Sequence, residues 1–185
     1  MSESPTPADI VPDDKDWTWT LTRQCPDCGF TAAAVPGGDI AAWVMAATEP
    51  WSSVLARPDV TQRPRPQVWS PLEYGCHVRD VCRLFDQRLH LMLDQEEPTF
   101  ANWDQDVTAV EDDYGSQDPA VVAEELAAAG AAYARSYAAV RADQWDRSGL
   151  RSNGSRFTVL TLGQYGLHDL VHHVWDVQAP LTAPV

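Results

Sequence analysis

The fold is decided by the stretch WSPLEYGCHVRD, residues 69–80, which contains the clearest helix start in the sequence. Ser70 can cap the helix, the proline after it suits the first helical position, and Glu73 completes a Ser-x-x-Glu capping box. His77 and the apolar residues four and seven positions further on share one helical face. This helix is therefore predicted to run to about Gln95, with His77 turned into the core.

Three further amphipathic helices are predicted along the chain. In each of them, apolar residues recur at intervals of three and four. The first covers about residues 38–57 with a bend at Pro50, the next starts at Asp118 and ends near Val140, and the last covers about residues 162–177. A capping box from Thr161 to Gln164 is expected at the start of the last helix.

The connections between these helices are predicted to be long. A proline-rich connector covers residues 57–68, and a surface loop with aromatic anchors covers residues 96–117. Between residues 143 and 159, Ser152-Asn153-Gly154 indicates a tight turn or a small hairpin. Because amphipathic helices are buried most simply against one another, we predict an all-α four-helix bundle with long crossover connections.

The chain is predicted to form one domain, since its 185 residues suit a single core. Residues 1–20 begin with a polar, proline-rich segment that has no periodicity, so we expect a flexible tail there. Residues 21–185 then form the helical bundle, with a Cys-x-x-Cys loop near its start.

Charge narrows the range of partners. The chain has 13 Lys and Arg against 27 Asp and Glu, a formal net charge of -14. A field of that sign repels nucleic-acid phosphates and anionic lipids, so we expect neither nucleic acid nor membrane as a partner and leave a homodimer open. The sequence shows no signal-peptide pattern and no apolar run of roughly 18 residues. We therefore expect a cytoplasmic protein whose four cysteines stay reduced.

Three histidines carry the main functional signal. His168 and His172 are four residues apart on the last predicted helix, so both rings lie on one face and can reach one ion. His77 also faces the core. Three neutral imidazoles would leave a tetrahedral ion one open position, as in catalytic sites. From the residues alone, one metal site and separate core histidines with ordinary hydrogen bonds both remain open.

The sequence resembles the DinB-like superfamily, which includes mycothiol-dependent maleylpyruvate isomerases and S-transferases. The resemblance rests on residues 69–80 and on FTV (157–159) followed by HDLVHHVWD (168–176), and it covers most of residues 38–178. It implies a four-helix bundle that binds a divalent ion through one histidine on the second helix and a His-x-x-x-His pair on the last. Those positions correspond here to His77, His168 and His172. The ion implied is zinc, nickel or iron, with a low-molecular-weight thiol as a further cofactor.

Three carboxylates lie at positions from which they could orient these histidines. Glu73 and Asp80 flank His77 at minus four and plus three, and Asp176 lies four residues beyond His172. The alternative interpretation of each is a solvated charge on a helix face.

The pair Cys25-Pro26-Asp27-Cys28 is followed by a glycine and looks like one knuckle of a zinc ribbon. Cys76 and Cys82 lie six apart on a predicted helix, about 120° from a common face, and cannot form a second knuckle. Three interpretations stay open for Cys25 and Cys28: a loop pair without metal, a reversible disulfide, or a second metal site.

Two functions follow as hypotheses. The first is a metal-dependent thiol transferase or isomerase, in which the ion ionises a thiol that attacks a small-molecule substrate. The second is a non-catalytic metal-binding or interaction protein, with Cys25-x-x-Cys28 as a redox or zinc element. An open coordination position that faces a pocket would favour the enzyme.

Overall fold

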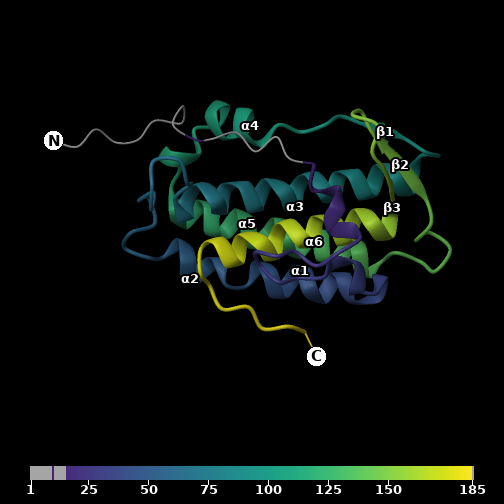
Figure 1. Cartoon of the computed structure of the whole chain (residues 1–185), viewed down its shortest axis with the longest axis horizontal. Coiled ribbons are helices and arrows are strands. Elements are labelled where there is room, and N and C mark those ends of the chain that lie inside the picture. The colour runs from purple at the N-terminus through teal and green to yellow at the C-terminus, as the bar shows by residue number, and fades with distance from the viewer. Residues whose placement is uncertain (1–9, 11–15, 185) are drawn as a thin grey trace.

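The computed structural model describes residue 10 and residues 16–184 of the chain. Five of the described helices form the body of the molecule. The long ones run roughly side by side (Figure 1). The five helices are α1 (Ile40–Thr48), α2 (Trp51–Leu55), α3 (Pro71–Asp94), α5 (Pro119–Ala138) and α6 (Val159–Asp176). Since α1 and α2 are one helix interrupted at Pro50, as the proline predicts, the architecture is a four-helix bundle.

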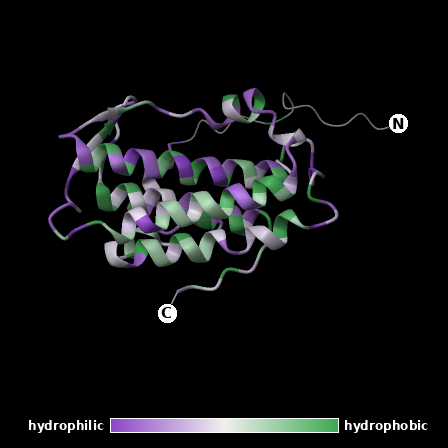
Figure 2. Ribbon diagram, turned by 180° about the vertical axis from the view of Figure 1, so that it is seen from behind, coloured by the Kyte–Doolittle hydropathy of each residue, from purple (hydrophilic) through white to green (hydrophobic). Residues whose placement is uncertain are grey.

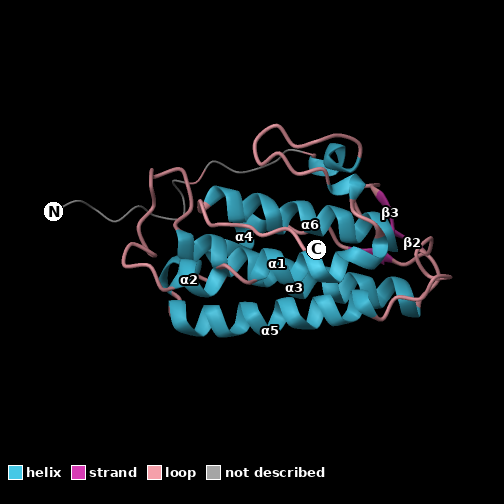
Figure 3. Cartoon of the chain, turned by 90° about the horizontal axis from the view of Figure 1, so that it is seen from below, coloured by secondary structure: helices cyan, strands magenta, loops and turns pink. Residues whose placement is uncertain are grey.

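The helices pack around a single hydrophobic core. Helix α3 lies against α5 and α6, and α1 closes the other side against the same two helices (Figure 3). Hydrophilic and hydrophobic residues are intermingled along the helices of the bundle (Figure 2). The largest fully buried side chains include Trp51, Tyr133, Tyr137 and Phe157. The predicted all-α bundle is therefore confirmed.

The start of α3 is the predicted capping box. The Ser70 hydroxyl accepts a hydrogen bond from the Glu73 backbone N–H, and the Glu73 carboxylate accepts one from the Ser70 N–H at 2.8 Å. Arg63 forms a buried ion pair with the same carboxylate. Although burial raises the pKa of Glu73, the Arg63 and Ser70 hydrogen bonds lower it below its ordinary value overall.

Helix α6 begins three residues earlier than predicted. Its cap is Thr158, whose side chain accepts from the Thr161 N–H, while the Thr161 hydroxyl accepts from the Thr158 N–H. The predicted box from Thr161 to Gln164 was wrong because a threonine here makes the returning bond that Glu or Gln usually makes.

The predicted loop over residues 96–117 contains short elements. These are β1 (Thr99–Phe100), α4 (Gln105–Glu111) and the 3-10 helix Tyr114–Ser116. The predicted hairpin is confirmed: β2 (Ser148–Arg151) pairs antiparallel with β3 (Arg156–Thr158), and β1 adds in parallel to β2. The sheet lies at one end of the bundle (Figure 1).

The predicted tail over residues 1–20 lies mostly outside the described residues. Its last part, however, forms a 3-10 helix, η2 (Trp17–Leu21), which packs on α6. The bundle therefore includes residues before the predicted boundary at residue 20. In the described part of the chain, no helix is long and apolar enough to cross a membrane.

Candidate metal centres

Helix α6 carries two pairs of potential metal ligands, and the second pair is shifted by one residue along the sequence from the first. The first pair is His168 and His172, and the second is Asp169 and His173. Each pair has the four-residue spacing that stacks two side chains on one helical face. Because successive residues turn by about 100°, the two pairs point to different neighbours.

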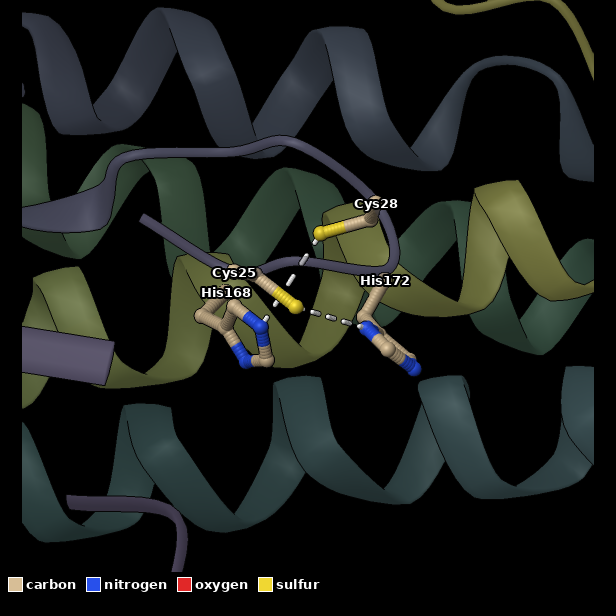
Figure 4. Close-up of side chains that lie close together, drawn as sticks. All are labelled: Cys25, Cys28, His168 and His172. Atoms are coloured by element: carbon tan, nitrogen blue, oxygen red, sulfur yellow. Dashed lines mark hydrogen bonds between the residues drawn. The ribbon is translucent and has the colours of Figure 1, made fainter. Parts of the chain in front are cut away.

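The first pair meets the Cys-x-x-Cys loop. Cys25, Cys28, His168 and His172 each place one ligand atom within 4.8 Å of the others. Cys25 Sγ lies 3.6 Å from His172 Nδ1, and Cys28 Sγ lies 4.0 Å from His168 Nε2 (Figure 4). We call these four residues the cysteine–histidine cluster.

Burial opposes charge on three members of this cluster, Cys28, His168 and His172. Desolvation raises the pKa of the Cys28 thiol to about 11 and lowers the pKa of His168 to about 4. Burial also lowers the pKa of His172. Neutral imidazoles are the form that binds a metal, whereas a thiol must lose its proton on binding.

The second pair meets α3. His77 Nε2 lies 3.1 Å from Asp169 Oδ1, and His173 Nε2 lies 3.2 Å from the same oxygen. On its other side, His173 Nδ1 lies 2.8 Å from Asp176 Oδ2. We call His77, Asp169 and His173 the histidine–aspartate cluster; their ligand atoms also lie within 4.8 Å of one another.

Charges in this second cluster are strongly coupled. Burial opposes protonation of His173, but its hydrogen bonds to Asp169 and Asp176 raise its pKa to about 9. Burial lowers the pKa of His77, although Asp169 opposes that shift. The neighbouring His77 and His173 hold the pKa of Asp169 well below its usual range despite its burial. Among the described residues, His77 Nδ1 is buried without a hydrogen-bond partner.

The structure thus divides the three predicted histidines between two clusters. His168 and His172 lie together as predicted, but their neighbours are Cys25 and Cys28 rather than His77. The physical reason is helical phase: the face of α6 that points at α3 carries Asp169 and His173, not the predicted pair.

Of the three carboxylates predicted to orient histidines, Asp176 hydrogen-bonds to His173 rather than to His172, the partner that its spacing predicts, and it lies 3.8 Å from His172 Nε2. Glu73 instead caps α3. Asp80 accepts hydrogen bonds from Arg79 and from the Tyr114 hydroxyl, the latter at 2.6 Å. Within the described chain, neither Glu73 nor Asp80 hydrogen-bonds to a histidine of either cluster.

Sequence reasoning missed Asp169 and His173. His173 is turned about 100° from His172 on the helix, so it falls outside the predicted histidine pair. The sequence does contain a signal for these two residues. Asp169 and His173 are four residues apart, the same spacing that predicts a ligand pair at His168 and His172. The fifth histidine, His90, lies on the surface near Ser136 and Asp86.

A cavity of about 390 Å³ opens beside both clusters, and Asp169, His173, His168 and His172 are in its wall. The rest of the lining is largely aromatic and acidic, and its described residues include no Lys or Arg. These lining residues include Trp17, Trp69, Tyr74, Tyr165, Trp175, Asp27, Asp106 and Asp176. This volume suits a small organic ligand.

The sequence profile of the DinB superfamily matches residues 41–177. The chain therefore belongs to the DinB superfamily, as the resemblance in residues 69–80 and 157–176 predicts.

Among solved structures, the chain is similar to YfiT from Bacillus subtilis, described as a probable metal-dependent hydrolase with an unusual four-helix bundle topology. The two chains are 17% identical, with a TM-score of 0.63 over 77% of this chain and 83% of YfiT. At this identity the likeness supports the fold. No curated protein gives a significant match.

Proposed function

We propose that this protein is a metal-dependent enzyme whose reactive divalent ion is bound by His77, Asp169 and His173. The observation that carries the proposal is the position of this cluster: its ligand atoms converge, and two of its three residues are in the wall of a cavity of about 390 Å³. Two residues of the cysteine–histidine cluster line the same cavity, but that cluster offers four ligands, whereas the three ligands here leave a coordination position open toward the cavity.

The ligand set fits a divalent ion. Two atoms about 2.1 Å from one ion lie roughly 3.0 to 3.4 Å apart in octahedral or tetrahedral geometry. The separations of 3.1 and 3.2 Å around Asp169 Oδ1 lie in that range. Two imidazoles and one carboxylate leave at least one coordination position open, as in catalytic zinc and non-haem iron sites.

A divalent ion bound there would supply Lewis acidity that lowers the pKa of a coordinated thiol or water. The protein's own residues orient the ligands. Asp176 bonds to His173 Nδ1 and fixes the direction of its other nitrogen. Trp103 stacks on the His77 ring, with planes 4° apart, and Trp69 lies 5.3 Å from the same ring. These rings shield His77 from water.

The cavity wall defines the class of substrate. Its aromatic rings favour a ligand with an apolar part, and its carboxylates disfavour an anion. We propose thiol-dependent transfer to, or isomerisation of, a small neutral or cationic molecule. The support for a thiol is the sequence resemblance to mycothiol-dependent enzymes, whereas the description of YfiT supports water as the alternative nucleophile.

Calorimetry with mycothiol tests this proposal. Zinc-loaded protein should bind the thiol, His77→Ala should lose binding, and His90→Ala should retain it because His90 lies outside both clusters. Absence of binding to the zinc-loaded protein, or equal binding without zinc, would overturn the thiol mechanism. If esters or amides are then hydrolysed in a zinc-dependent way, the nucleophile is water. If no such turnover occurs, the non-catalytic alternative is favoured.

A further inference from the structure

We propose that Cys25, Cys28, His168 and His172 bind one zinc ion in a closed tetrahedral site that fastens the N-terminal segment to helix α6. The site is separate from the reactive centre. It joins the two motifs that the sequence presents far apart, the Cys-x-x-Cys loop and the pair His168 and His172.

The separations fit zinc. With Zn–S bonds of about 2.3 Å and Zn–N bonds of about 2.0 to 2.1 Å, a sulfur and a nitrogen ligand lie roughly 3.6 Å apart in a tetrahedron. The distance from Cys25 Sγ to His172 Nδ1 is 3.6 Å, and that from Cys28 Sγ to His168 Nε2 is 4.0 Å. The side chains point toward one another from the loop and the helix (Figure 4).

The loop has the backbone of a ligand turn. The Gly29 N–H donates to the Cys25 carbonyl at 3.0 Å, and the Cys25 N–H donates to the Phe30 carbonyl at 2.9 Å. Gly29 has a φ of 71°, a left-handed conformation that glycine adopts without strain. This closed turn holds both thiols on the side that faces α6.

The chemistry of the ligand set indicates a structural ion. Two thiolates and two neutral imidazoles fill all four positions, and the two negative charges balance a divalent cation. Cys25 is fully buried and His168 is 4% exposed, so a charge-balanced site avoids the cost of an unpaired buried ion. Binding releases the two thiol protons to solvent, and no oxidant or reductant is needed.

The site would also shape the cavity. The Trp17 ring lies 5.6 Å from the His168 ring and 5.5 Å from the His172 ring, and both Trp17 and Asp27 are in the cavity wall. A zinc ion that fixes residues 17–35 against α6 therefore supports one side of the proposed substrate pocket.

Cobalt spectroscopy tests this inference without depending on the enzyme activity. Metal-free full-length protein titrated with Co²⁺ should develop a sulfur-to-cobalt charge-transfer band, which the histidine–aspartate cluster cannot produce because it contains no sulfur. The band should be lost in the Cys25→Ser/Cys28→Ser double variant. It should remain in His77→Ala and in Cys82→Ala, a control that removes a buried thiol from the core of α3.

A cobalt-loaded wild-type protein without this band, or a band that persists in the double variant, would overturn the proposal. If the double variant does not fold, X-ray absorption at the zinc edge of the wild-type protein shows whether the zinc has sulfur ligands. We expect sulfur ligands at about 2.3 Å. A shell of nitrogen and oxygen alone would contradict the site.

Discussion

His172 and His173 are neighbours in the chain, yet their rings stand at 86° to each other with centroids 5.8 Å apart, and they belong to different ligand clusters. One turn of α6 thus contributes to two sites. His172 faces the loop with Cys25, and His173 faces α3 and the cavity. This division is the basis of both metal sites that we propose.

Asp169 should matter more for metal binding than Asp176. Asp169 Oδ1 is shared by His77 and His173, whereas Asp176 orients only the far nitrogen of His173. We expect Asp169→Asn to weaken metal binding at the histidine–aspartate cluster by more than about 100-fold and Asp176→Asn by about 10- to 100-fold. Competition with a chelator measures the metal affinity of both variants. The measurement uses the Cys25→Ser/Cys28→Ser background, which removes the thiol ligands of the other cluster. Equal losses would argue that Asp169 is not a ligand.

The pair of Arg63 and Glu73 should make stability depend on acid pH. Because the folded-state pKa of Glu73 is lowered, its contribution is complete above the unfolded value of 4.5 and is lost as pH falls through the folded value. Glu73→Gln removes the buried carboxylate charge of this ion pair, so we expect a loss of about 3 kcal/mol near pH 7.

Urea unfolding of wild type and Glu73→Gln at a series of pH values checks this expectation. The gap in unfolding free energy should narrow below about pH 4.5, where Glu73 of the unfolded wild-type chain begins to take up a proton while the folded carboxylate stays ionised. A gap that stayed constant or widened in acid would contradict it.

Gly163 should be required for packing between α6, α1 and α5. A Cβ at this position would lie 2.7 Å from Ile40 Cδ1 and 2.7 Å from the Tyr137 ring. Tyr137 is held by a hydrogen bond to the Val159 carbonyl and cannot easily move. We expect Gly163→Ala to lower the free energy of unfolding by about 1 to 3 kcal/mol, although alanine favours helix.

Gly38→Ala is the matched control for this change, since nothing lies within 4 Å of its Cβ position. It should change stability by less than about 0.5 kcal/mol. Thermal or urea unfolding measures the stability of both variants. Equal losses in Gly163→Ala and Gly38→Ala would show that close packing at Gly163 does not cause the loss of stability.

The features that sequence predicted well are local. The Ser70–Glu73 capping box, the break at Pro50 and the helix beginning after Asp118 each depend on residues within one or two turns of each other. The start of α6 was predicted three residues too late. Thr161 was predicted to be the N-cap, whereas it completes the capping box of Thr158 by accepting a hydrogen bond from the Thr158 N–H.

The candidate site was predicted only in part because it depends on tertiary contacts. Helical spacing correctly paired His168 with His172. It could not show that a loop 140 or more residues away would cover that pair, nor which face of α6 would meet His77. Both outcomes depend on the rotation of α6 about its axis, which packing sets and spacing alone does not.

The central claim is that His77 and His168 serve different ions. The most direct test is the zinc content of purified, fully loaded protein and its variants. We expect about two ions per chain in the wild type, about one in either His77→Ala or His168→Ala, and almost none in the double variant. A wild type that binds about one ion, lost equally in both single variants, would contradict the account and restore a single three-histidine site.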